Sequence, residues 1–404
     1  MVNMQDRDHS HNQPLSGIRV LDLSTVIFGP YASLVLADYG AEVIKVESAQ
    51  GDPTRYIGPA REEGMSAVYL GSNRNKKSVA LDLKTSHGIA ALYALIDTAD
   101  VLMHNIRPQK LAALGLDAKA LLDRHRRLVY VSLNGFGQDG AYAGKPAYDD
   151  IVQGLSGATA LTQMQTGVPS YFPAVMADKV GALTAVHAIL AALLLRDRSG
   201  QGQVVEVPMF EAMTANVLVE HYFARHIPES DGSPGYSRLL TSDRRPFPTR
   251  DGYVCMMPYS DAHWHRFFTN SGFPEYAQDP RFKSLSLRTQ NIDALYTRAS
   301  EILKTQSTSY WLENLEAWDI PAGRVNALHD LEQDPHLLSV NFFETIPDRD
   351  GKSYRYPRNP VRIQGMRVPM TSPARLGEHT DEVLRSTELS EALIEKNFFS
   401  PNTH

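Results

Sequence analysis

One acidic residue stands at the start of an apolar stretch, where its position could serve chemistry. Asp178 lies in AVMADKVGALTAVHAILAALLL, before apolar spacing that predicts a helix from about Lys179 to Arg196. An aspartate at this position is most simply a helix cap, which contributes about 1 kcal/mol. A helix N-terminus also stabilises a carboxylate anion by up to about 1 kcal/mol, which would keep a nucleophile ionised at neutral pH. Spacing alone favours the cap, but one carboxylate can serve both purposes.

Tyr148 and Asp149, in AYDDIVQGLSG, form a second candidate for chemistry. A tyrosine hydroxyl in general titrates at about pH 10, so it is a poor proton acceptor near neutrality but a good hydrogen-bond donor. The equally simple alternative is a tyrosine that packs at the end of a strand. Asp149 is expected to orient either Tyr148 or a turn of the backbone.

The elements that would position these residues follow an alternating pattern. The helical pattern YASLVLADYG lies between two β-branched runs, IRVLDL and AEVIKVE, and SVALDLKTSHGIAALYALIDTADVLMHNI repeats the arrangement. RLVYVSLNGFG and VVEVPMF predict two further strands. The alternation predicts an α/β fold with a parallel sheet and helices on its faces. Sites on such sheets lie beyond the carboxyl ends of the strands, so the loops STVIFGP, HNIRP and LNGFG are expected to form the site.

Composition shifts along the chain predict two domains. A stretch rich in Gly, Pro, Ser and Arg separates the strand-helix part from a second part that begins at DGYVCMMPY and contains the helical patterns NIDALYTRASEIL and SYWLENLEAW. The predicted organisation is a disordered tail (1–13), a large domain (14–225), a linker (226–248), a small α+β domain (249–365) and a C-terminal segment that returns to the large domain (366–404).

Several functional motifs are absent from the sequence. DLSTVIFGP has one glycine after the first strand, which excludes the dinucleotide fingerprint and the P-loop. There is no H-E-x-x-H motif, and HWH at His263–His265 is more simply a surface or packing feature than a set of metal ligands. GLSGA lacks the second half of a serine-hydrolase elbow, so Ser156 is expected in a turn. We expect neither a metal nor a permanently bound cofactor.

Composition limits the partners and the compartment. The 404 residues are 43% hydrophobic and 21% charged with a net charge of −6, which gives no reason to expect nucleic acid or an acidic membrane as a partner. Cys255 is the only cysteine, so no disulfide framework exists and a reducing, cytoplasmic location is expected. The polar start MVNMQDRDHSHNQ is not a secretory signal, and the longest apolar run, Ala188 to Leu195, is too short to span a bilayer.

Six segments together resemble the class III CoA-transferase family (CaiB/BaiF type) in the order that the family has them. They are PLSGIRVLDLSTVIFGPYASLVLADYGAEVIKVE, NRNKKSVALDLK, ADVLMHNIRP, AYDDIVQGLSG, AVMADKVGALTAVHAILAAL and LGEHTDEVL. The family includes formyl-CoA transferase, dicarboxylate CoA-transferases and α-methylacyl-CoA racemase, and the resemblance spans about Pro14 to Leu384. It implies a Rossmann-like large domain built from both chain ends, a smaller domain and an interlocked homodimer.

The resemblance also implies roles for the two candidate residues. Asp178 occupies the position of the family's nucleophile, which forms a mixed anhydride with the acyl group and then a thioester with CoA. Tyr148 stands where the racemase branch has a histidine that exchanges protons, so the tyrosine favours hydrogen bonding to a thioester or anhydride oxygen, as in the transferase branch.

The CoA site is carried over by motif. LDLK implies Leu81 and Lys84 beside the nucleotide, and HNIRP implies three more contacts, Asn105, Ile106 and Arg107. In the STVIFGP loop, Val26, Ile27 and Phe28 are expected near the pantetheine thiol, and Lys145 near a phosphate. Formyl-CoA transferase has a glutamine where Ile27 stands, which argues against formate or oxalate as substrate. The glycine-rich lid of that enzyme is also missing, since RRPFPTRDGYV occupies the nearby stretch.

The sequence therefore predicts an enzyme that moves CoA from an acyl-CoA donor, with succinyl-CoA expected, to a small acid such as itaconate, mesaconate or glutarate. Three arginines, Arg238, Arg244 and Arg245, either hold a distal carboxylate or are solvated linker charges. The alternatives are an acyl-CoA racemase or epimerase, and a non-catalytic acyl-CoA-binding protein. Neither nucleic acid nor a membrane is an expected partner.

Overall fold

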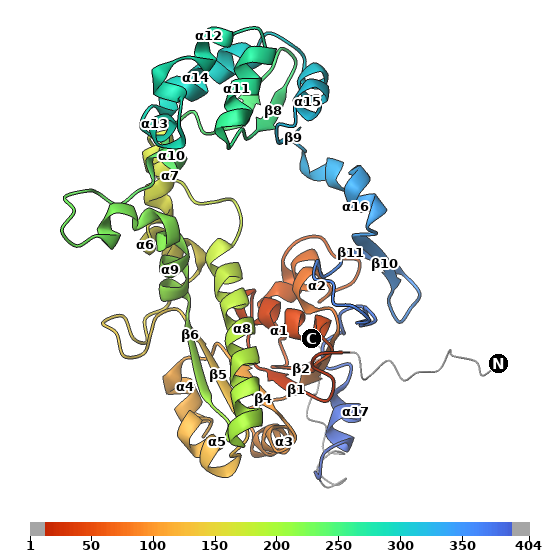
Figure 1. Ribbon diagram of the computed structural model, residues 1–404. Coiled ribbons are helices and arrows are strands. Elements are labelled where there is room, and N and C mark those ends of the chain that lie inside the picture. The colour runs from red at the N-terminus through yellow and green to blue at the C-terminus, as the bar shows by residue number, and fades with distance from the viewer. Residues whose placement is uncertain (1–12, 390–404) are drawn as a thin grey trace. The chain divides into compact units, whose positions relative to one another are not determined.

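The computed structural model describes residues 13–389, which form two compact units (Figure 1). Unit 1 takes the described residues of Met1–Leu155, Ala174–Thr214 and Asn341–His404, and unit 2 takes Ser156–Pro173 and Ala215–Val340. The predicted disordered tail, apart from Gln13, and the last part of the predicted C-terminal segment (390–404) lie outside the described residues. The predicted domain boundaries stay predictions.

Unit 1 is built on a six-stranded parallel sheet in the order β3-β2-β1-β4-β5-β6. Its strands are β1 (Arg19–Asp22), β2 (Glu42–Glu47), β3 (Lys76–Ala80), β4 (Val101–His104), β5 (Val129–Asn134) and β6 (Val204–Pro208). The prediction of an α/β fold with a parallel sheet is confirmed. In this doubly wound order successive strands are added on one side of β1 up to β3 and on the other side from β4 onward, while all strands stay parallel. In such sheets ligands bind beyond the carboxyl ends of the strands at this switch point, here between β1 and β4.

Helices cover both faces of this sheet. Successive side chains of a strand point to opposite faces, so buried apolar side chains on both faces need helices to pack against. Leu21 of β1 and Ile44 of β2 face one hydrophobic core, and that core is completed by residues of four helices. The four are α3 (Ser86–Ile96), α4 (Pro108–Ala113), α5 (Ala118–Arg124) and α17 (Thr380–Arg385).

The opposite face of the sheet carries α1 (Phe28–Asp38) and α8 (Met176–Ser199), which pack against each other. The contact depends on Gly181 of α8, because a Cβ atom there would lie 2.8 Å from the ring of Phe28. The glycine therefore lets the two helices approach closely beneath the start of α1.

Unit 1 also contains shorter elements. These are α2 (Ala67–Asn73), α6 (Asp149–Leu155), the first turns of α9 (Met209–His221), and an antiparallel hairpin of β10 (Phe343–Pro347) and β11 (Ser353–Pro357). The C-terminal helix α17 packs against β3, where the hydroxyl of Thr380 accepts the N–H of Ala80.

Unit 2 packs helices on a small antiparallel sheet ordered β7-β8-β9. The strands are β7 (Phe247–Pro248), β8 (Tyr253–Met256) and β9 (Ala322–Arg324). The helices are α7 (Ala158–Thr166), α10 (Ser237–Leu240), α11 (Asp261–Asn270), α12 (Pro274–Ala277), α13 (Leu285–Gln290), α14 (Ile292–Leu303), α15 (Thr308–Ala317) and α16 (Pro335–Ser339). Its core is aromatic, with Trp264, Phe267 and Trp311 buried in one cluster.

By length and composition alone, α8 is apolar enough to cross a membrane, and it is the one such helix among residues 13–389. The buried core helix of a soluble protein meets the same criteria. In this structure Ala182, Ala185 and Ile189 of α8 are buried.

Candidate active site

A cavity of about 220 Å³ lies at the carboxyl ends of the central strands of unit 1. Three loops line it: the loop after β1 with Thr25, Val26 and Phe28, the loop after β4 with Asn105 and Arg107, and the loop after β5 with Asn134 and Gly135. These are the loops that the sequence pattern predicted to matter. Gln138, Lys145, Tyr148 and Asp178 complete the polar part of the lining.

Asp178 is buried at this cavity, with 8% of its surface exposed. The helix that carries it begins at Met176 and is preceded by Val175, which occupies the N-cap position. Asp178 is therefore the third residue of the helix, and the interpretation as an N-cap is wrong. The predicted start at Lys179 was late because Val175 is not an ordinary capping residue and gives no signal in the sequence.

A second carboxylate lies against Asp178. The Oδ1 atom of Asp149, at the start of α6, accepts the backbone N–H of Asp178 at 3.1 Å, and its Oδ2 atom accepts the side-chain amide of Gln153 at 2.6 Å. Burial, and then the negative charge of Asp149, raise the pKa of Asp178 to about 7. The expectation that the helix N-terminus keeps this carboxylate ionised at neutral pH is therefore wrong, because a carboxyl group with a pKa of about 7 is in large part protonated there. Strongly shifted acids in cavities are typical of functional sites.

Tyr148 lies at the mouth of the cavity with 69% of its surface exposed. Its carbonyl accepts the N–H of Val152 where α6 begins, so it does not pack at the end of a strand as the alternative held. Asp149 binds the backbone N–H of Asp178 in the first turn of α8, 29 residues further along the chain.

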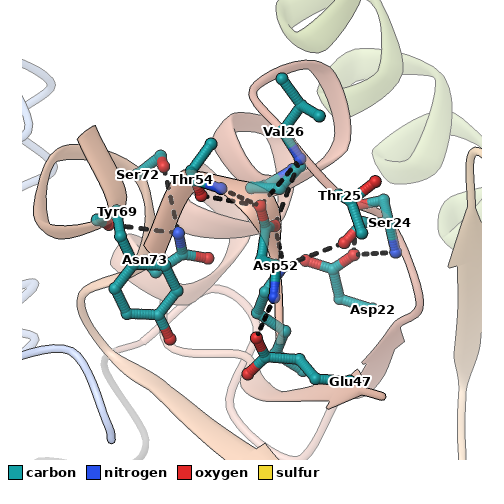
Figure 2. Close-up of polar contacts among 12 residues, drawn as sticks. Asp22, Ser24, Thr25, Val26, Glu47, Asp52, Thr54, Tyr69, Ser72 and Asn73 are labelled. Atoms are coloured by element: carbon teal, nitrogen blue, oxygen red, sulfur yellow. Dashed lines mark hydrogen bonds and ion pairs between the residues drawn. The ribbon is translucent and has the colours of Figure 1, made fainter. Parts of the chain in front are cut away.

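The loop after β1 is held in an uncommon conformation. Val26 has φ 73°, in the left-handed region that a β-branched residue enters at a cost on the order of 1–3 kcal/mol. Figure 2 shows its N–H directed at the buried carboxylate of Asp52. The side chain of Asn105 binds both backbone polar groups of Thr25. Its oxygen accepts the N–H of Thr25 at 3.1 Å, and its NH₂ group donates to the carbonyl of Thr25 at 2.9 Å.

The loop after β4 rests on a buried histidine. The N–H of Ile106 donates to Nδ1 of His104, which leaves Nε2 to donate to the hydroxyl of Tyr130 at 2.8 Å. Tyr130 donates in turn to the carbonyl of Leu116 at 3.0 Å. Burial lowers the pKa of His104 to about 4, so the ring is neutral at physiological pH and acts as a fixed support.

The loop after β5 is supported by two acids that sequence reasoning missed. Glu206 of β6 accepts from the side chain of Asn134 and from the N–H of Gln138, both at 2.9 Å, and Glu211 of α9 accepts the N–H of Gly137 at 2.9 Å. Their position around the carboxyl end of a strand, in VVEVPMFE, is a signal that could have found them.

The remaining predicted contacts lie outside the cavity lining. Ile27 is half-buried beside it, Ile106 packs against the hydrophobic core, Leu81 is fully buried in that core, and Lys84 is exposed before α3. Their proposed contacts with CoA stay predictions. Among residues 13–389, no group of three or more His, Cys, Asp or Glu side chains could hold a metal ion.

The arrangement can do nucleophilic chemistry. A buried carboxylate that titrates near neutrality faces an open cavity, and polar loops surround it on the sheet's carboxyl side. A carboxylate in such a site can attack an acyl carbon and form a covalent intermediate.

Comparisons with known proteins identify the class. The model of CoA-transferase family III matches residues 15–380. The chain is 34% identical to the succinate–glutarate CoA-transferase of Agrobacterium fabrum over 97% of this chain and 99% of the relative. It is 29% identical to the human succinyl-CoA:glutarate CoA-transferase over 94% of this chain and 87% of the relative.

The fold comparison agrees. A solved CaiB/BaiF family protein from Brucella suis has a TM-score of 0.78 at 31% identity and covers 92% of this chain and 98% of its own. The solved Rv3272 from Mycobacterium tuberculosis has a TM-score of 0.78 at 30% identity, covering 91% of this chain and 98% of its own. The chain therefore belongs to CoA-transferase family III and is a class III CoA-transferase, an enzyme that uses CoA thioesters as substrates.

Proposed function

We propose that this enzyme moves CoA from succinyl-CoA to a small dicarboxylic acid, with glutarate, itaconate and mesaconate as the candidate acceptors. The observation that carries the proposal is the buried Asp178 at a cavity formed by the three loops of the sheet's switch point. The names of two relatives, a succinate–glutarate CoA-transferase and a succinyl-CoA:glutarate CoA-transferase, support succinate and glutarate as the acid pair.

The proposed reaction proceeds through covalent adducts of Asp178. Its carboxylate attacks the thioester carbonyl and expels CoA thiolate, which gives an aspartyl–acyl anhydride. The thiolate attacks the aspartyl carbonyl and releases the donor acid, which leaves an aspartyl-CoA thioester. The acceptor carboxylate attacks that carbonyl and expels CoA thiolate, which gives an aspartyl–acceptor anhydride. The thiolate finally attacks the acceptor carbonyl of this anhydride, which forms the new thioester and releases Asp178 as a carboxylate.

Side chains at the cavity suit the two parts of CoA. Arg107 and Lys145 are exposed cations at its rim, suited to charge-assisted contacts with phosphates. Val26 and Phe28 supply apolar surface for the pantetheine arm, and Asn105 is placed beside the same loop. Tyr148 is the proposed donor to the thioester or anhydride oxygen.

Arg244 and Arg245 belong to unit 2, and a role for them at the acceptor's distal carboxylate stays a prediction. Both line a cavity of about 510 Å³ within unit 2, together with Cys255, Met256 and Met257. Two guanidinium groups beside an apolar wall fit a short aliphatic chain that ends in a carboxylate. Arg238 lies over the ring of Tyr259 and does not line this cavity.

A matched acid screen tests the proposed substrates. Purified enzyme is given succinyl-CoA with glutarate, itaconate or mesaconate, and with the monocarboxylates butyrate and valerate of similar length. Mass spectrometry of the thioesters should show new CoA esters of dicarboxylates at rates at least about tenfold above the monocarboxylates, because a distal carboxylate binds a fixed cation site. Equal rates with butyrate would contradict the dicarboxylate assignment. The same acids are also given with acetyl-CoA, and faster transfer from acetyl-CoA than from succinyl-CoA would contradict succinyl-CoA as the donor.

The Tyr148→Phe variant separates transfer from racemisation. We expect transfer to fall by roughly tenfold, since one hydrogen bond of about 1 kcal/mol or somewhat more is lost. Tyr56→Phe, at another exposed tyrosine of unit 1, should stay at the wild-type rate.

With a chiral 2-methylacyl-CoA in D₂O and no acceptor acid, the wild-type enzyme should not exchange the α-proton. Rapid exchange that Tyr148→Phe abolishes would favour the racemase instead.

We also propose a homodimer, supported by the outer side of α8. Leu183 and Leu194, eleven residues apart, lie on one helix face and are about half exposed in the single chain. An apolar stripe of this kind on a long helix is typical of an interface. Light scattering should give twice the 44.9 kDa mass of one chain, and Leu183→Asp with Leu194→Asp should shift the mass toward the monomer. A monomeric wild-type enzyme would contradict the proposal.

A further inference from the structure

We propose that Asp52 and Lys45 are positioning residues that hold the loop after β1 in the shape that acyl transfer to Asp178 requires. Neither was a candidate in the sequence, and neither lines the cavity. The proposal rests on the proposed function of the cavity and deepens it, because it assigns residues that set the geometry of the same site.

The carboxylate of Asp52 holds the left-handed residue of the loop. Its oxygens accept the N–H of Val26 at 3.2 and 3.3 Å, and it also accepts the N–H and hydroxyl of Thr54 at 2.9 and 2.7 Å. Figure 2 shows Asp52 between Val26 and Thr54, below the turn of the loop. Val26 donates this N–H while its backbone has φ 73°.

Lys45 holds the other end of the same turn. Its ammonium group donates to the carbonyl of Ser24 at 2.9 Å and to Oδ2 of Asp52 at 2.8 Å. Both charged side chains are fully buried. One ion pair therefore binds the loop at two points. Lys45 binds the carbonyl of Ser24, and Asp52 binds the N–H of Val26, two residues further along the chain.

Several further polar contacts fix the pair. The N–H of Asp52 donates to Glu47 at 2.9 Å, and Glu47 forms a buried ion pair with Arg55. The pair is thus attached to β2 and to the segment that follows it. On the other side of the loop, Asn105 binds the peptide of Thr25.

The choice of valine at the turn favours positioning over simple folding. Glycine adopts a positive φ without strain, and it would be the ordinary residue if the chain only needed to turn. Valine needs an external contact to stay there, and a buried ion pair is in general a weak source of stability. Valine at this position together with the buried ion pair confines the loop to one conformation, whereas glycine would allow it several conformations.

Phe28 connects the conformation of this loop to the helix that carries Asp178. Phe28 lies two residues after Val26, and its ring packs on Gly181, three residues after Asp178 on α8. A displaced loop would move both the cavity wall and the packing beneath the first turn of α8. Small displacements of this kind can cost about a hundredfold in rate.

The test compares two folded variants in which a buried ion pair is removed whole. Lys45→Met with Asp52→Leu removes the loop contacts without leaving an unpaired buried charge, because leucine has no group that can accept the N–H of Val26. The matched control, Asp38→Leu with Arg74→Met, removes another buried pair of unit 1 that does not bind the loop. The readout is the single-turnover rate of adduct formation on Asp178, followed by mass spectrometry after rapid quenching, together with the dissociation constant for CoA.

We expect the Lys45/Asp52 variant to form the adduct about 10- to 100-fold more slowly, with CoA affinity within about threefold of wild type. The control should keep the wild-type rate. An unchanged rate in the folded Lys45/Asp52 variant, or an equal loss in the control, would overturn the positioning role. A wild-type enzyme that forms no adduct at all would instead overturn the proposed function.

A second pair decides the matter if the first variant does not fold. Val26→Pro cannot donate an N–H and cannot adopt a positive φ, whereas Val26→Ala keeps both and changes only the side chain. Proline should slow adduct formation at least tenfold more than alanine does. Equal rates in the two variants would overturn the proposal.

Discussion

Replacing Asp178 with asparagine should lower acyl exchange by about 10⁴-fold or more and leave the protein folded. Asparagine keeps the shape of the side chain, but its amide cannot form the anhydride on which every later step depends. The helix start is held by Asp149 through the backbone N–H of residue 178, which asparagine retains. Exchange of labelled succinate into succinyl-CoA measures the chemistry, and circular dichroism measures the fold.

The control is Asp150→Asn, an equal change of charge at an exposed site of α6. It should keep the wild-type exchange rate. Wild-type enzyme incubated with succinyl-CoA and then treated with hydroxylamine should show a mass change on the peptide that contains Asp178, and the Asp178→Asn variant should show none. Retained activity in that variant would remove Asp178 from the mechanism. An unmodified but CoA-binding wild-type chain would favour a binding protein.

The sheet of unit 1 was predictable because its signals are local. β-branched runs of four to six residues alternate with segments of helical spacing, and this is enough to place the strands and to predict that they run parallel, although it does not give their order in the sheet. The same rule placed the site, because strand ends meet at one edge of a parallel sheet. Three loops that are far apart in sequence were therefore predicted to matter before their contacts were known.

What could not be predicted depends on contacts between distant segments. Lys45 stands in AEVIKVE, where alternation makes it resemble a solvent-facing residue, yet it is fully buried against Asp52. The pairing of Asp149 with Asp178 joins residues 29 positions apart, so the near-neutral pKa of Asp178 has no signal in the sequence. Buried polar networks are specified by tertiary geometry, and periodicity does not report them.

The last prediction concerns pH. Because the nucleophile is the ionised form of Asp178, kcat/KM for succinyl-CoA should rise about tenfold per pH unit on the acidic side and level off above about pH 7. The pKa is raised first by burial and then by Asp149, so removing the charge of Asp149 should move this midpoint to lower pH. Burial persists, and the midpoint should therefore stay above the usual value for an aspartate.

Asp149→Asn is the variant that isolates this effect. The carbonyl of the introduced asparagine can still accept the N–H of Asp178, so this contact is kept while the charge is lost. Gln153 has to turn its amide to accept from the new NH₂ group, and it then gives up its contact with the carbonyl of Ala174. Steady-state rates from about pH 5 to pH 9 for wild type, Asp149→Asn and the control Asp150→Asn give the comparison. Ionisation of the substrates is common to all three profiles, so only a difference between them reports on Asp178. If the Asp149→Asn midpoint coincides with that of wild type, the charge of Asp149 does not control the nucleophile, and burial alone sets its pKa.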